Sequence, residues 1–133
     1  MNPTFPVIIV SPEQVLYEGE GEMVVCRTTE GEIAFMPGHQ PLLGALGTAK
    51  VRVIQPEGEQ TAAVHEGFVE VTGDRVVVLS DVAELPEQID VARAQAAKDR
   101  AETGLRSEPE NEELLAALAR ADLRLEVAGA STG

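Results

Sequence analysis

The composition of the chain changes within residues 75–102, RVVVLSDVAELPEQIDVARAQAAKDRAE. The first part is rich in valine, which favours β-strands. After Pro86 the stretch is dominated by alanine, glutamate, glutamine, lysine and arginine, which favour helices. Proline suits the first turn of a helix, and the acidic Glu87 suits its positive end. We therefore expect two domains, a β domain over residues 1–85 and a helical domain over residues 86–133.

Short runs rich in β-branched residues precede this boundary and are separated by glycine and proline turns. They are residues 7–10, 22–28, 50–54, 61–65, 68–71 and 75–79. Several of them alternate polar and apolar residues, as half-buried strands do. Short strands at this spacing indicate an antiparallel β-sandwich or barrel.

Two helices are expected after the boundary, one over residues 87–102 and one from Glu110 onward, joined by a bend over residues 104–111. An apolar seam at heptad spacing follows the second helix, and an alanine-rich seam follows the first. The seam residues are Leu114, Leu118, Ala121, Leu125 and Ala128, facing Ala94, Ala97, Ala101 and Leu105. Alanine contacts bury little area at about 25 cal/mol per Å², so this hairpin should be able to open. The predicted fold class is α+β, an N-terminal antiparallel β-sandwich followed by a C-terminal antiparallel α-helical hairpin.

The overall composition restricts the partners of the chain. It has 133 residues, a formal net charge of −13 and 3% aromatic residues. A nucleic-acid partner is not expected, because phosphate binding needs basic surface and base stacking needs aromatic rings. No apolar run approaches the roughly 20 residues of a membrane span, and the N-terminus lacks the features of a signal peptide. We expect no direct membrane insertion, with any membrane association made through another protein.

The residues that usually carry catalysis are scarce. The motifs HExxH, CxxC, GxSxG and the P-loop do not occur. His65 lies in a predicted strand, where a surface or packed imidazole is expected, and Cys26 is expected to be a small buried hydrophobe in a reducing cytosol. We expect no catalytic centre, no metal site and no catalytic cofactor.

Four arginines of the predicted hairpin form a pattern. Arg93 and Arg100 lie two turns apart on one helix, and Arg120 and Arg124 lie at i and i+4 on the other. Antiparallel folding about Ser107 should place Arg124 level with Arg93 and Arg120 between Arg93 and Arg100. An anion among them would make charge-assisted hydrogen bonds. The alternative is that they face solvent or pair with acidic neighbours, and the pattern does not separate the two. Those neighbours are Asp99, Glu102, Asp122 and Glu126.

Three segments resemble signatures of the epsilon subunit of F-type ATP synthases. They are GEIAFMPGHQPLL (residues 31–43), GFVEV followed by VVVLSDVAE (residues 67–84), and IDVARA (residues 89–94). Their order and spacing and the chain length agree with that family, so the resemblance covers nearly the whole chain. Local departures are Ala34 in place of the usual glycine and Phe35 in place of the usual aliphatic residue in the first segment, and Glu66 in place of a glycine just before the second.

The resemblance implies a β-sandwich followed by a helix-turn-helix, and a non-catalytic central-stalk subunit of a proton-transporting ATP synthase. The implied partners are the gamma subunit and the ring of c subunits, at the cytoplasmic face of the bacterial cell membrane, where the chain would be held peripherally. The subunit would couple ring rotation to the catalytic head. Its tail would extend to the alpha/beta head and inhibit ATP hydrolysis.

The resemblance also implies two sets of site residues. Glu32 and His39 match a loop that faces the c ring. A second set matches positions that bind a regulatory ATP in those bacterial members that bind one, and it includes the four arginines. This set is Glu84, Ile89, Asp90, Arg93, Ala94, Arg100, Arg120 and Arg124. Gly104 and Pro109 loosen the bend, and the second helix carries few basic residues, which would weaken its attraction to the head.

Two other functions remain open. The chain could be a purely structural stalk adaptor whose tail is a fixed clamp without nucleotide. It could also be a free-standing small-molecule hydrolase, although the missing nucleophile–base pair argues against this. Binding of ATP would separate the first alternative from a regulatory tail, and turnover by the purified chain would support the second.

Overall fold

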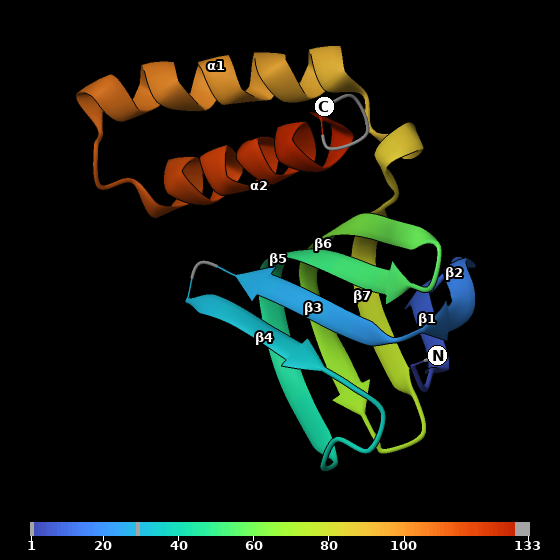
Figure 1. The fold of residues 1–133 in the computed structure, drawn as a ribbon. Helices are drawn as coiled ribbons and strands as arrows, with labels where there is room; N and C mark the ends of the chain where they lie inside the picture. The colour runs from blue at the N-terminus through green and yellow to red at the C-terminus, as the bar shows by residue number, and fades with distance from the viewer. Residues whose placement is uncertain (1, 29, 130–133) are drawn as a thin grey trace. The chain divides into compact units, whose positions relative to one another are not determined.

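A computed structural model of the chain describes residues 2–28 and 30–129. The chain divides into two compact units, one ending at Glu84 and the other beginning at Leu85. Figure 1 shows the first as a curled sheet and the second as a pair of helices. The predicted fold class is confirmed.

The strands of the first unit form one continuous hydrogen-bonded sheet in the order β2-β1-β7-β6-β5-β3-β4. They are β1 (Phe5–Ser11), β2 (Gln14–Gly21), β3 (Met23–Thr28), β4 (Gly31–Phe35), β5 (Leu42–Gln55), β6 (Gly58–Val71) and β7 (Val76–Glu84). Neighbouring strands are antiparallel, except that β1 runs parallel to β7. The sheet therefore departs from the purely antiparallel sheet that we expected at this one pair.

The sheet folds into a sandwich at a corner in its two longest strands, β5 and β6, which have 14 residues each. The register shifts on both sides of Gly47, next to Gly67 of β6. Gly47 has φ 62°, and Glu66 has φ 58°. Bulges of this kind bend a strand and increase its twist, so both strands pass from one layer to the other. The bend is visible in Figure 1.

Aliphatic side chains from both layers fill the core. Fully buried members are Val7, Ile9, Val24, Val51, Val53, Val64, Val71, Val76 and Val78, together with Phe5 and Phe35. Cys26 is also fully buried, and burial raises the pKa of its thiol to about 12. The prediction that Cys26 acts as a small buried hydrophobe is confirmed.

The second unit begins with a single 3₁₀ turn, η1 (Pro86–Gln88), before α1 (Val91–Ser107). The predicted start of the helix at Glu87 was wrong. Asp90 has extended backbone angles, and its side chain accepts a hydrogen bond of 3.0 Å from the Arg93 amide. An aspartate in this position satisfies an amide at the helix start, so α1 begins after it.

The predicted bend also began too early, because α1 continues through Gly104 to Ser107. A Cβ on Gly104 would lie 2.8 Å from Leu114 Cδ1. Gly104 therefore lets the two helices approach closely and does not end the first. The second helix, α2 (Glu112–Gly129), follows Asn111, whose Oδ1 accepts from the Leu114 amide at 3.1 Å. Within the described residues, no helix combines the length and apolar character that crossing a bilayer requires.

Candidate functional sites

The register of the hairpin is set by an ion pair between its helices. Lys98 Nζ of α1 lies 3.1 Å from Asp122 Oδ1 of α2. The carboxylate of Asp122 raises the pKa of the Lys98 ammonium, first through this hydrogen bond and then through its charge. Because the helices are antiparallel, Arg120 then lies level with Arg100.

This ion pair and the approach of Gly104 to Leu114 place Arg120 and Arg124 opposite the part of α1 between Arg93 and Arg100, to within about one turn. The expected level of Arg124 stays a prediction.

The four arginines nevertheless lie on one side of the hairpin. Each residue turns an α-helix by about 100°. Arg93, Arg100 and Arg120 each come directly before a buried alanine of the seam, namely Ala94, Ala101 and Ala121. Arg124, four residues after Arg120, falls on the same side of α2. Lys98 and Asp122 instead come directly after the seam residues Ala97 and Ala121. Their contact therefore lies on the other side of the hairpin from the four arginines.

One of these arginines has an acidic partner that the sequence reading did not consider. Arg120 Nη2 lies 3.3 Å from Glu113 Oε1, whose side chain is 81% exposed. Two acids that were considered are bonded elsewhere, because Asp122 pairs with Lys98 and Asp99 accepts from Gln95 at 3.0 Å. An exposed ion pair contributes little stability. A polyanion could therefore replace Glu113 at Arg120 at small cost.

The other predicted nucleotide residues of the hairpin have structural roles in this state. Ile89 and Ala94 are buried, and Asp90 caps α1. Glu84 belongs to the first unit, where its Oε1 lies 3.1 Å from His65 Nε2. A carboxylate only accepts, so the imidazole donates this hydrogen bond.

The residues predicted to face a c ring lie in and after β4. Glu32 is exposed near the start of β4, and His39 is half-buried in the loop that follows the strand. The His39 ring packs edge-on against Phe35 with centroids 5.2 Å apart, and its Nδ1 donates to the Gln40 carbonyl at 2.6 Å. Glu32 and the buried Phe35 are three residues apart in one strand, so they lie on opposite faces of β4. The isolated chain does not bring Glu32 and His39 together.

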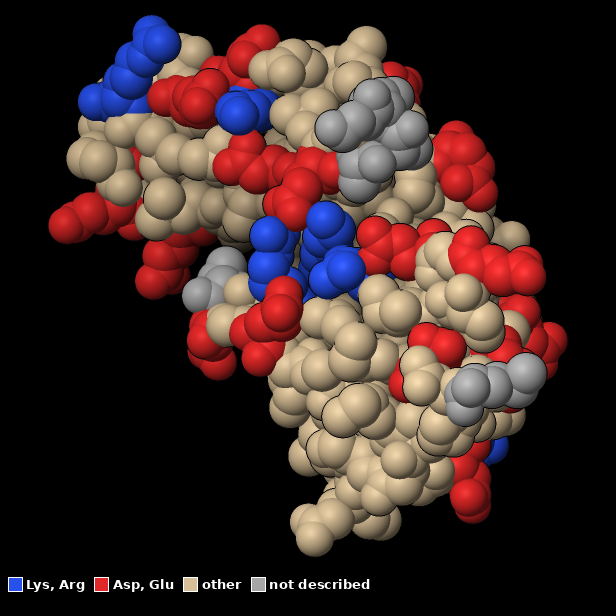
Figure 2. All heavy atoms as spheres, in the orientation of Figure 1, with Lys and Arg blue, Asp and Glu red and all other residues tan. Residues whose placement is uncertain are grey.

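Exposed apolar side chains surround this loop. Figure 2 shows acidic side chains scattered over the visible face, with a broad area without Lys, Arg, Asp or Glu over the lower part of the sandwich. The exposed apolar residues of β4, of the loop and of the start of β5 are Ile33, Met36, Leu42 and Leu43. Several large apolar side chains exposed around one loop are typical of protein–protein contact.

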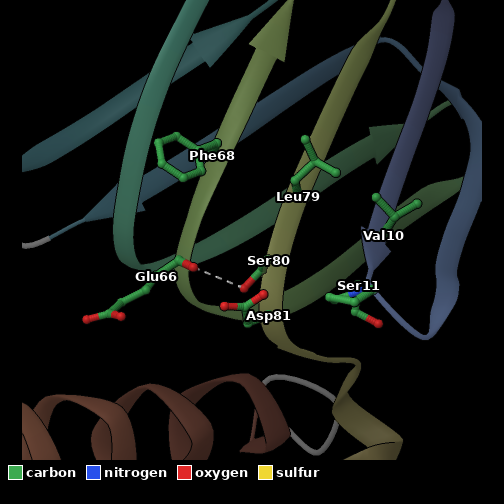
Figure 3. Close-up of a pocket in the computed structure, with 8 residues that line it drawn as sticks. Val10, Ser11, Glu66, Phe68, Leu79, Ser80 and Asp81 are labelled. Atoms are coloured by element: carbon green, nitrogen blue, oxygen red, sulfur yellow. Dashed lines mark hydrogen bonds between the residues drawn. The ribbon is translucent and has the colours of Figure 1, made fainter.

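A second apolar surface lies across β1, β7 and β6. Val10 is in register with Leu79, and Leu79 with Phe68. Phe68 is 56% exposed and Leu79 46%. They line a shallow pocket of about 220 Å³ that Glu66 and Asp81 border (Figure 3). Our sequence reading missed this surface, although the alternation of Phe68 and Glu70 with buried Val69 and Val71 signals an outward-facing phenylalanine.

Comparisons with known proteins agree along the chain. The family model described as ATP synthase, Delta/Epsilon chain, beta-sandwich domain matches residues 4–86, and the model described as ATP synthase, Delta/Epsilon chain, long alpha-helix domain matches residues 87–129. The chain is similar to the ATP synthase epsilon chain of Shouchella clausii, with 44% identity over 126 residues, covering 94% of this chain and 95% of that protein. It is similar to the ATP synthase epsilon chain of Thermobifida fusca, with 48% identity over 128 residues, covering 93% and 91%.

A solved structure shares the fold at low identity. It is a chain in the cryo-EM structure of Euglena gracilis mitochondrial ATP synthase, OSCP/F1/c-ring in rotational state 1. The TM-score is 0.73 at 19% identity, covering all of this chain and 84% of that chain. With both family models in succession and relatives above 40% identity over nearly their full length, the chain belongs to the delta/epsilon chain family of ATP synthases.

Proposed function

We propose that this chain is a non-catalytic central-stalk subunit of a proton-transporting F-type ATP synthase, held peripherally at the cytoplasmic face of the bacterial membrane. The observation that carries this proposal is the unbroken succession of both family domains over residues 4–129. In this role the chain would link rotation of the c ring to the catalytic head, and the chemistry would belong to neighbouring subunits.

The two exposed apolar surfaces support the partners that this role requires. The exposed apolar residues Ile33, Met36, Leu42 and Leu43 would face the c ring, and Glu32 on β4 and His39 in the following loop would each contact it at a separate point. The pocket of Val10, Phe68 and Leu79 would receive the gamma subunit. Both surfaces have large apolar side chains in the open, which a partner would remove from water.

Copurification tests these partners. The tagged full chain, expressed with the other subunits, should bring down the gamma subunit and the c ring. Phe68→Glu should abolish gamma recovery, because it would place a charge among apolar contacts. Val91→Glu is the matched control, since Val91 is similarly exposed (52%) and lies in α1, outside both surfaces. Loss of gamma with both variants, or with neither, would contradict the assignment of the pocket.

We further propose that the hairpin is the regulatory part of the subunit and that ATP binds along its arginine side. Guanidinium groups from both helices would hold the phosphates of one ATP and thereby favour the closed hairpin. In the open state the tail would extend to the alpha/beta head and inhibit ATP hydrolysis. The shift between the two states is limited by the difference in ATP affinity between them.

Titration of the full chain with ATP, followed by amide NMR, tests this site. Shifts should appear around Arg93 and Arg120, and Arg100→Ala should weaken binding about tenfold or more, as expected for losing one charge-assisted bond. Arg106→Ala is the matched control, because Arg106 follows Leu105 and lies on the Lys98 side of α1. Equal weakening by both variants would indicate general charge attraction, and the absence of shifts at millimolar ATP would refute the site.

The structural adaptor remains the second candidate, and one observation favours it. The Lys98–Asp122 pair and the close contact of Gly104 with Leu114 join the two helices directly. If the tail is a fixed clamp, deleting the residues after Pro86 should weaken assembly of the complex and leave its ATP hydrolysis unchanged. Faster hydrolysis after the deletion would instead support the regulatory role.

A further inference from the structure

His65 is a buried titratable group that the proposed function does not use. Only 5% of its surface is exposed. Its Nε2 donates to Glu84 Oε1 at 3.1 Å, and its Nδ1 is buried without a hydrogen-bond partner in the described part of the chain. Histidine is the side chain that changes charge most readily near neutral pH.

The carboxylate that it holds is at a junction. Glu84 is the last residue of β7, and Leu85 begins the second unit. His65 is in register with Val82, and Glu84 is two residues further along β7, so both side chains lie on the same face of the sheet. The contact thus ties the end of β7 to β6 at the point where the sandwich ends.

The charged groups beside His65 come from the strands that flank it. From β7 there is Glu84. From β5, Thr48 is directly opposite His65, and Lys50 is the nearest charged residue on that face, opposite Ala63. On β6 itself Glu66 follows His65, but its side chain is exposed at the rim of the apolar pocket. Glu84 is the group in hydrogen-bond contact with the ring.

We propose that the His65–Glu84 contact is a proton-linked clasp on the end of β7, which tightens when His65 is protonated. A carboxylate in contact with an imidazole favours the imidazolium form. By thermodynamic linkage, protonation of the ring also raises the free energy needed to separate Glu84 from His65. A proton on Nδ1 would be buried without an acceptor, and this opposes protonation of the ring. The cost is the same whether or not Glu84 is in contact. It therefore does not change the direction in which protonation affects the His65–Glu84 contact.

The clasp makes the junction pH-dependent. Acid conditions should hold residues 82–84 in the sheet, and alkaline conditions should let them separate more easily. The clasp does not depend on nucleotide, and only its effect on the tail rests on the proposed function. Measurements on the ATP-free full chain therefore distinguish failure of the clasp from failure of the regulatory site.

The test is NMR of the full chain between about pH 5.5 and pH 8, the range in which histidines titrate. The ring signals of His65 are recorded alongside the amide signals, in the wild-type chain and in Glu84→Gln. Hydrogen exchange of the Glu84 and Leu85 amides is expressed as protection factors, which correct for the intrinsic pH dependence of exchange. These protection factors should be about fivefold higher at the acid end of the range. The carboxylate is already ionised, so protonation adds the attraction of one further unit charge, which at this distance in a water-like medium is about 1 kcal/mol and gives this ratio.

His65→Gln is the matched variant, because glutamine can donate to Glu84 but does not titrate. It should have protection factors that do not change with pH. Glu84 is partly exposed, so Glu84→Gln should keep the fold even if the buried variant does not. Protection factors of the Glu84 and Leu85 amides that do not change with pH in the wild type, or that change as much in His65→Gln, would overturn the proposal.

Discussion

Gly67 provides a severe test of the packing at the sandwich corner. A Cβ at this position would lie 2.5 Å from the Leu79 carbonyl oxygen and 2.9 Å from Val64 Cγ1. An ordinary carbon–oxygen contact is about 3.4 Å, so β6 and β7 would have to separate by nearly 1 Å. The obstacle is backbone, which cannot rotate away as a side chain can.

The cost of Gly67→Ala follows from what that separation breaks. Ser80 Oγ lies 2.8 Å from the Val82 carbonyl oxygen and 3.1 Å from the His65 carbonyl oxygen across the strands, and its single proton can still be donated to Val82 when the strands separate. Losing one neighbouring ladder bond costs about 1 kcal/mol, and overpacking strain adds about 1–3 kcal/mol. We expect Gly67→Ala to lower the free energy of unfolding by about 3 kcal/mol.

Urea unfolding followed by tyrosine fluorescence measures this change in the sandwich alone. The chain has one tyrosine and no tryptophan, and Tyr17 lies in β2, where its hydroxyl accepts from Gln55 Nε2 at 2.6 Å. Gly44→Ala is the matched control, because its Cβ would meet only Val69 Cγ1 at 3.9 Å. That control should change stability by less than about 0.5 kcal/mol. A similarly small effect of Gly67→Ala would refute the argument.

Further predictions concern single sites. Glu66→Gly should stabilise the sandwich by about 0.5–1 kcal/mol. Glycine adopts φ 58° without the strain that glutamate has there, and this gain exceeds the entropy that glycine loses on folding. No gain in the same urea assay would contradict this. Asn111→Ala should destabilise α2 by about 1 kcal/mol because the helix loses its N-cap. Thermal unfolding followed by helical circular dichroism should show an earlier transition. Asn2→Ala is the control, because Asn2 caps no helix. Cys26 should resist thiol reagents at pH 8 until the chain unfolds. Its raised pKa should also make stability fall as pH rises above about 9 toward 12, because only the unfolded thiol ionises there, whereas a Cys26→Ala variant should not show this fall.

The elements that the sequence reading missed share a physical cause. The edge strand β2 (Gln14–Gly21) contains Glu18, Gly19 and Glu20, and most of it is exposed. An edge strand hydrogen-bonds a single neighbour and buries little, so its composition resembles that of a loop. The parallel pairing of β1 with β7 joins segments more than sixty residues apart, and local pattern contains no information about such a partner.

The candidate sites show the same division. Helical periodicity alone placed the four arginines on one side of the hairpin, because the direction of a helical side chain follows from its position in the chain. The level at which they face each other depended on contacts between helices, namely the Lys98–Asp122 pair and the contact of Gly104 with Leu114. The periodicity of α2 therefore could not show which residues of α1 lie opposite Arg124.

Composition, periodicity and short motifs were enough to establish the β and α parts of this chain, the change near Pro86 and the resemblance to a known family. These features are local, since each depends on residues within one or two turns or along one strand. The tertiary structure alone decided the strand order, the corner at Gly47 and Gly67, the exposed Phe68 pocket and the contact of His65 with Glu84. Each of those features depends on packing between segments distant in the chain, where sterics and hydrogen bonding across the sheet select among arrangements that the local pattern leaves equivalent.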